Sequence, residues 1–206
     1  MNIFRQLTEK PWLAGRDTVV DIRGGAFFMP TASLGLRVFL AVIAVLFSIL
    51  IVAYAERMSL GDWRSLPDPW LLWPNTFMLI LSSIALQSAC VGAREGQVDR
   101  VKTGLTAGGV FAFAFLLGQL LVWRDLIGSG YFAASNPANA FFYLLTATHG
   151  FHLMGGLVAW GRTSAKLWRG TDSELAKLRL SVELCAVYWH FLLLVWLIFF
   201  ALLLIT

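Results

Sequence analysis

The chain has 206 residues, of which 58% are hydrophobic and only 14% carry a charge. A soluble domain has roughly 25% charged residues, so the composition excludes an ordinary soluble enzyme and favours a membrane protein. The net charge of +4 does not indicate a nucleic-acid partner. In a membrane protein, the placement of Lys and Arg is explained first by the orientation of the chain in the membrane.

Five apolar stretches predict five transmembrane helices, at residues 36–56, 72–93, 103–123, 139–161 and 181–205. Each is long enough to cross a hydrocarbon layer of about 30 Å at 1.5 Å per residue. The stretches do not alternate in hydrophobicity, which argues against a transmembrane barrel. We therefore expect an all-α, polytopic bundle over residues 34–206, preceded by a cytoplasmic N-terminal arm at 1–33.

The basic residues predict the orientation of this bundle. With the N-terminus in the cytoplasm, the inner side holds every one of the 16 Lys and Arg except Arg57, Arg64 and Arg124. Because Lys and Arg collect in cytoplasmic loops, we expect the N-terminus inside and the C-terminus outside.

All three histidines fall in predicted helices. His149 and His152 are three residues apart and share one helix face. His152 and His190 both lie about 14–15 Å from the inner ends of their helices, so a level pair could ligate a haem or a metal. The alternative is a polar seam between helices, with Thr146, Thr148 or Gln119 as hydrogen-bond partners. Only three histidines exist, which favours the seam.

Glu183 is the one acidic residue that falls well inside a predicted helix, and it shares a helix face with His190. A proton path through the membrane would require further carboxylates, and the sequence has none at such depth. No nucleotide-binding loop, zinc motif or nucleophile–base pair is present, so we expect no active site in this chain.

Small residues and cysteines favour packing over chemistry. Gly104 and Gly108 form a GxxxG pattern, which lets two helices approach closely and predicts a tight bundle. Cys90 and Cys185 both fall in apolar stretches, where a free thiol behaves as a small buried hydrophobe.

The last two predicted helices carry the most specific pattern. Residues 148–152 read Thr-His-Gly-Phe-His, and about 30 residues later Glu183 precedes Tyr188-Trp189-His190-Phe191 and Trp196. These elements resemble subunit III of the haem-copper terminal oxidases in its five-helix form. The stretches WPNTFMLILSS and FLLGQ are similar to two earlier helices of that family. Leu193 stands where many members have an acid.

The resemblance implies a non-catalytic, accessory subunit of a complex that reduces oxygen and pumps protons in aerobic respiration. It implies no cofactor in this chain, with haem and copper held by partner catalytic subunits. The implied partners are oxidase subunit I, subunit II and membrane phospholipids, in a bacterial cytoplasmic membrane. In this family the subunit holds lipid and supports proton uptake. The implied lipid or subunit contacts are His149, His152, Glu183, Tyr188, Trp189, His190 and Trp196.

Two alternatives stay open at this point. One is an accessory protein of a nitric oxide reductase, from the same family. The other is a haem-binding redox protein that uses His152 and His190. The sequence does not choose between cytochrome c and a quinol as the electron donor of the complex.

Overall fold

The computed structural model describes residues 31–64, 70–168 and 175–205, with side chains from residue 178 onward in the last range. Within these ranges the regular structure consists of five α-helices and no strand, which confirms the all-α prediction. They are α2 (Thr31–Met58), α3 (Leu72–Glu95), α4 (Val98–Gly128), α5 (Pro137–Trp168) and α6 (Leu175–Ile205). Residues 1–30 of the predicted arm lie outside the described ranges.

The helices extend past the predicted stretches because their first and last turns are polar yet still helical. Proline marks two beginnings, with Pro74 in the first turn of α3 and Pro137 as the first residue of α5, where a missing N–H costs nothing. Gly96 ends α3 in the left-handed conformation (φ 72°), and its N–H bonds the carbonyl of Gly92. This turn leads directly into α4.

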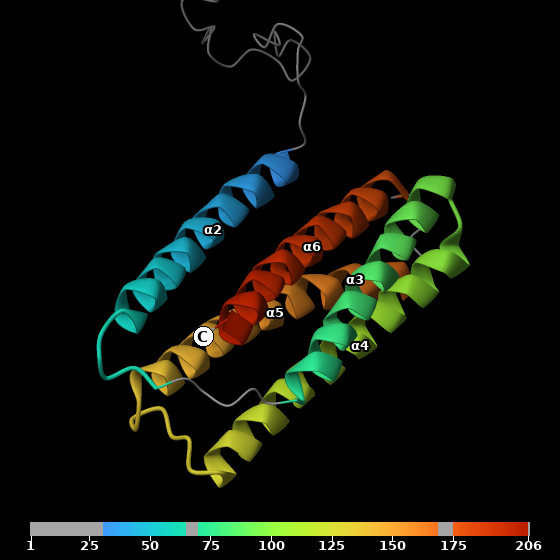
Figure 1. The fold of residues 1–206 in the computed structure, drawn as a ribbon. Helices are drawn as coiled ribbons and strands as arrows, with labels where there is room; N and C mark the ends of the chain where they lie inside the picture. The colour runs from blue at the N-terminus through green and yellow to red at the C-terminus, as the bar shows by residue number, and fades with distance from the viewer. Residues whose placement is uncertain (1–30, 65–69, 169–174, 206) are drawn as a thin grey trace, which may run out of the picture.

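Helices α3 to α6 form one bundle, and α2 lies against its side (Figure 1). In the bundle, α3 packs on α4 and α6, and α5 packs on the same two helices. Helix α2 packs on α5 and α6 but not on α3 or α4. The first helix of the described chain is therefore bound by the last two.

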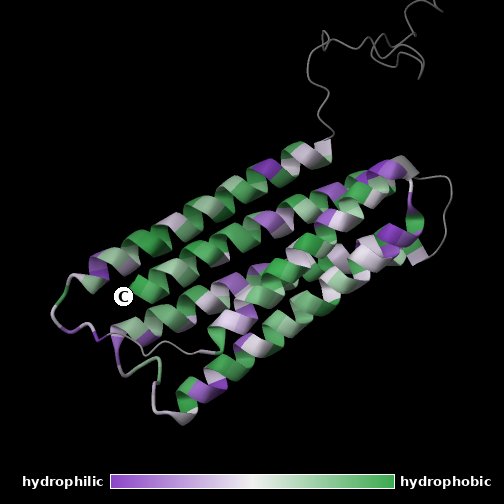
Figure 2. Ribbon diagram, turned by 45° about the vertical axis from the view of Figure 1, so that its right-hand side comes forward, coloured by the Kyte–Doolittle hydropathy of each residue, from purple (hydrophilic) through white to green (hydrophobic). Residues whose placement is uncertain are grey.

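The helices are hydrophobic along their length and more hydrophilic toward their ends (Figure 2). By length and composition, α2, α3, α4 and residues 178–205 of α6 are able to cross a membrane. Helix α5 falls outside this set, because polar residues such as Asn139, His149 and His152 interrupt its apolar sequence. The protein is thus a polytopic, all-α membrane protein, and its orientation stays a prediction.

The GxxxG pattern lies where α4 meets α3. A side chain at Gly104 would place its Cβ 2.7 Å from the carbonyl oxygen of Ala85. One turn on, the Ser82 hydroxyl donates a hydrogen bond of 2.7 Å to the carbonyl of Gly108. The predicted close approach of two helices is confirmed here, and it fixes the position of α3 on which the site below depends.

Candidate functional site

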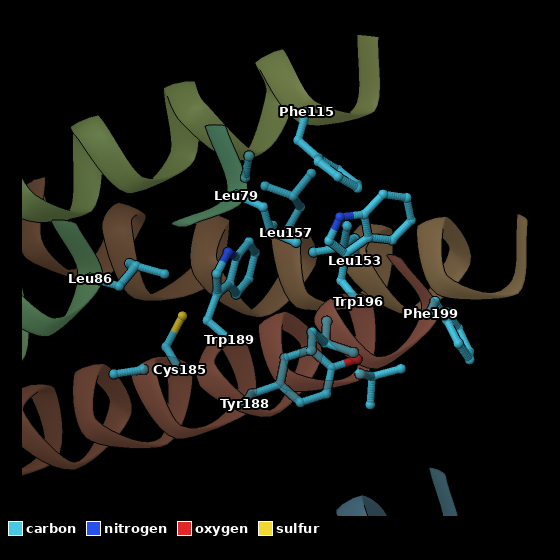
Figure 3. Close-up of a cluster of buried hydrophobic side chains, with 14 of the residues drawn as sticks. Leu79, Leu86, Phe115, Leu153, Leu157, Cys185, Tyr188, Trp189, Trp196 and Phe199 are labelled. Carbon is cyan, nitrogen blue, oxygen red and sulfur yellow. The ribbon is translucent and has the colours of Figure 1, made fainter. Parts of the chain in front are cut away.

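Two tryptophans of α6 occupy the centre of the bundle, as Figure 3 shows. Trp189 and Trp196 are seven residues apart, so they project from one face of α6, and neither has exposed surface. Trp196 packs edge-on against Phe115 of α4, with ring centroids 4.8 Å apart. Its Nε1 donates to the hydroxyl of Thr76 at 2.9 Å, which links α6 to α3.

His149 lies beside Trp196 in a fully buried aromatic pocket. Its ring centroid is 5.1 Å from that of Trp196 and 5.9 Å from that of Phe115, with Phe47 and Phe199 also in contact. Neither ring nitrogen has a hydrogen-bond partner in the described structure. The pocket therefore holds this imidazole by packing alone.

His152 faces α2. Its Nδ1 lies 2.8 Å from the carbonyl oxygen of Thr148, one turn back in the same helix, and its ring packs on Phe47 at 5.2 Å. The Tyr188 hydroxyl of α6 donates to the backbone carbonyl of His152 at 2.8 Å. Residues 152 and 188 are thus level with one another across α5 and α6.

His190 faces α3, on the other side of α6. Its Nε2 lies 3.0 Å from Oε1 of Gln87, and its Nδ1 pairs with the hydroxyl of Ser83. The two histidines with equal predicted depth therefore face different helices, α2 and α3, and these two helices do not touch each other. This separation does not favour the haem-ligand pair of His152 and His190.

The hydrogen-bond partners of the histidines differ from those predicted. Thr146 accepts a bond of 3.0 Å from Nε1 of Trp123, and Gln119 accepts one of 3.2 Å from Asn75. Thr148 serves His152 only through its backbone carbonyl. A polar seam between the helices does exist. Its histidine is His190, which pairs with side chains of α3, whereas the expected partners lie on α4 and α5.

Glu183 forms an ion-pair cluster near the inner end predicted for α6. Its Oε1 accepts from Nε of Arg94 at 2.9 Å and from Nε of Arg179 at 3.3 Å. The carboxylate side chain is 27% exposed, so the pair lies at the surface of the bundle and not in its core. The acidic residue that looked isolated in the sequence is neutralised by a neighbouring helix and by its own.

Sequence reasoning missed Asn75, Trp123 and Trp160 as functional candidates. Trp160 of α5 donates 2.8 Å to the carbonyl of Leu105, over Gly109 of α4. A buried amide and two half-buried ring N–H groups in apolar stretches were the available signal, since each needs a partner.

The seven residues with an implied contact role divide into two groups. His149, Trp189 and Trp196 have no exposed surface, so any effect on lipid or on another subunit would pass through the packing of the helices. Tyr188 is also buried, whereas His152, Glu183 and His190 lie partly open at the surface. Their role in lipid or subunit contact stays a prediction.

A groove of about 440 Å³ lies between α2, α5 and α6. Phe39 of α2 forms one wall and Tyr188 of α6 another, while Gly155 leaves space along α5. Arg162 lies at this groove and is exposed. We call it the α2 groove. Among the described residues, no cluster of three or more His, Cys, Asp or Glu side chains is arranged to hold a metal.

The family described as cytochrome c oxidase subunit III matches residues 66–205, which is more than half of the chain. The chain belongs to this family. The matched range covers α3 to α6 and every residue with an implied contact role.

Several curated relatives are similar over most of their length. A probable cytochrome c oxidase subunit 3 of Mycobacterium tuberculosis is 29% identical over 150 residues, covering 71% of this chain and 72% of the relative. A cytochrome c oxidase subunit 3 of Thermostichus vulcanus is 28% identical, covering 82% of this chain and 85% of the relative. A cytochrome bo(3) ubiquinol oxidase subunit 3 of Buchnera aphidicola is 25% identical, covering 81% and 82%. The similar proteins thus include subunits of both cytochrome c and quinol oxidases.

Proposed function

We propose that the chain is the accessory subunit III of a haem-copper oxidase in a bacterial cytoplasmic membrane. The single observation that carries this is the family match over α3 to α6. In this role the chain binds to the catalytic subunit I and to subunit II, which hold the haem and copper. The reaction of the complex is the reduction of oxygen coupled to proton pumping.

The chain stabilises the complex and does not perform the chemistry. Several of its buried polar side chains are joined in pairs between helices, as in Asn75 with Gln119 and Trp196 with Thr76. Such pairs hold helices together in a membrane. None of these pairs combines a nucleophile with a base.

Lipid binding and support of proton uptake complete the proposal. The α2 groove is lined mainly by apolar groups and has the cation Arg162 at its edge, which suits an acyl chain below a phosphate. A lipid held there would brace α2 against α5 and α6, where it has few protein neighbours. A stable subunit III in turn supports proton delivery to subunit I.

Purification of the native complex tests the assignment. An affinity tag on this chain should recover a larger haem-bearing subunit, with a haem spectrum and oxygen consumption that is sensitive to cyanide. Recovery of the chain without a haem protein, from membranes that hold an active oxidase, would refute it. Nitric oxide turnover without oxygen consumption would instead assign the chain to a nitric oxide reductase, an alternative that the relatives do not favour.

A further inference from the structure

The outward surface shared by α3 and α6 carries polar groups at the depth of lipid tails. Gln87 is exposed, and it precedes Glu95, the last residue of α3, by eight positions. At 1.5 Å per residue its Cα lies about 12 Å from that end of the helix. We call this surface the α3–α6 face; it comprises Ile84, Gln87, Arg94, Glu183 and His190.

The hydrogen bonds of His190 fix which groups of Gln87 are left over. Nε2 of His190 lies 3.0 Å from the amide oxygen of Gln87, so this nitrogen is the donor. The neutral ring then accepts through Nδ1 from the Ser83 hydroxyl. The amide nitrogen of Gln87 keeps two N–H donors, and no described residue accepts from them.

Lipid tails cannot accept these hydrogen bonds. A primary amide that faces hydrocarbon without a partner is costly, so an exposed one at this depth points to another protein chain. The outward face of α5 differs, since its exposed side chains include Phe151 and Met154, which suit lipid.

A second polar group lies on the same face. Arg94 follows Gln87 by seven residues, and Glu183 precedes His190 by seven, which is two turns in each helix. The Arg94 side chain is 54% exposed although it is paired with Glu183. A polar stripe therefore runs along the α3–α6 face, from its charged end to the middle of the helices.

We infer that the α3–α6 face docks against a transmembrane helix of the haem-bearing subunit, and that this helix presents a hydrogen-bond acceptor to the Gln87 amide. The inference rests on the proposed function and adds to it the face through which the subunits meet. The amide also constrains the position of the partner helix, because the acceptor must lie within hydrogen-bond distance of it.

Site-specific photo-crosslinking in the native complex tests the contact. A photoreactive amino acid replaces Ile84, 59% exposed and one turn from Gln87, or Met154, 52% exposed on α5, as the matched control. The expected result is a crosslink from position 84 to the haem-bearing subunit and only lipid adducts from position 154. Crosslinks to lipid or to a second copy of this chain from position 84 would overturn the inference, as would a subunit crosslink from 154 alone.

A substitution tests the hydrogen bond. Gln87→Leu should lower the amount of haem-bearing subunit that copurifies by roughly threefold, the effect of one interhelical hydrogen bond. Ser48→Ala is the control, because Ser48 is exposed on α2 but bonds the Ala44 carbonyl of its own helix. Equal recovery with both variants would count against the inference. A haem-bearing subunit that copurifies yet crosslinks only through α5 would refute this contact and leave the proposed function standing; its complete absence would refute both.

Discussion

Two adjacent glycines of α5 permit a sharp test of the packing between α5 and α6. A Cβ at Gly156 would lie 2.7 Å from ring atoms of both Trp189 and Tyr188, whereas a Cβ at Gly155 would meet nothing within 4 Å. Ordinary contact begins near 3.4 Å, so Gly156→Ala must move the rings or the helices by about 0.7 Å. Trp189 has no exposed surface and therefore no free space to move into.

The cost follows from this geometry. Overpacking of a tight core costs about 1–3 kcal/mol. The gain in helix propensity from Gly to Ala is common to both variants and cancels in their difference. Gly156→Ala should therefore be about 1–3 kcal/mol less stable than Gly155→Ala.

Thermal melting of the purified chain in detergent measures the difference. For a chain of this size, each kcal/mol shifts the melting temperature by about 2–4 °C, so the two variants should differ by about 2–12 °C. Equal melting temperatures would show that the rings yield freely, and would refute the account of α5–α6 packing given above.

Three further substitutions separate structural from chemical roles. His149→Leu should raise the melting temperature, because a buried imidazole without a hydrogen-bond partner costs about 1–3 kcal/mol; a lower melting temperature would reveal a partner. Trp196→Phe should destabilise the chain by about 1 kcal/mol through loss of its bond to Thr76, measured by the same melt, and no change would contradict that bond. Glu183→Gln should cause a small loss that disappears in high salt, since its partner Arg94 is exposed; a loss that persists in 1 M salt would contradict a surface ion pair.

The sequence predicts where the helices lie in the chain better than it predicts which helices pack together. Runs of apolar residues are sufficient to reveal a helix, because the membrane requires one, but they stop short of the polar turns at each end. The pattern at Gly104 and Gly108 correctly predicts a close approach, since small residues are the local condition for it. Which helix approaches depends on the packing of the whole bundle.

The histidines show the limit of this reasoning. Helix periodicity and depth place His152 and His190 level, and the bond between Tyr188 and the carbonyl of His152 agrees with that. The direction in which each ring points depends on which helices lie beside α5 and α6, and the sequence of a single helix does not determine its neighbours. The partnership of His190 with Ser83 and Gln87 therefore emerges only from the fold.

The placement of α2 has a consequence for the order in which the protein is built. Helices leave the ribosome in sequence order, so α2 enters the membrane before α3 and α4. Those two pair with each other as a compact hairpin through Gly96, but α2 touches neither. Its only helical neighbours in the described chain, α5 and α6, follow α3 and α4 in the sequence. Helix α2 thus stays in the lipid without a helical neighbour from the described chain until α5 and α6 have been made.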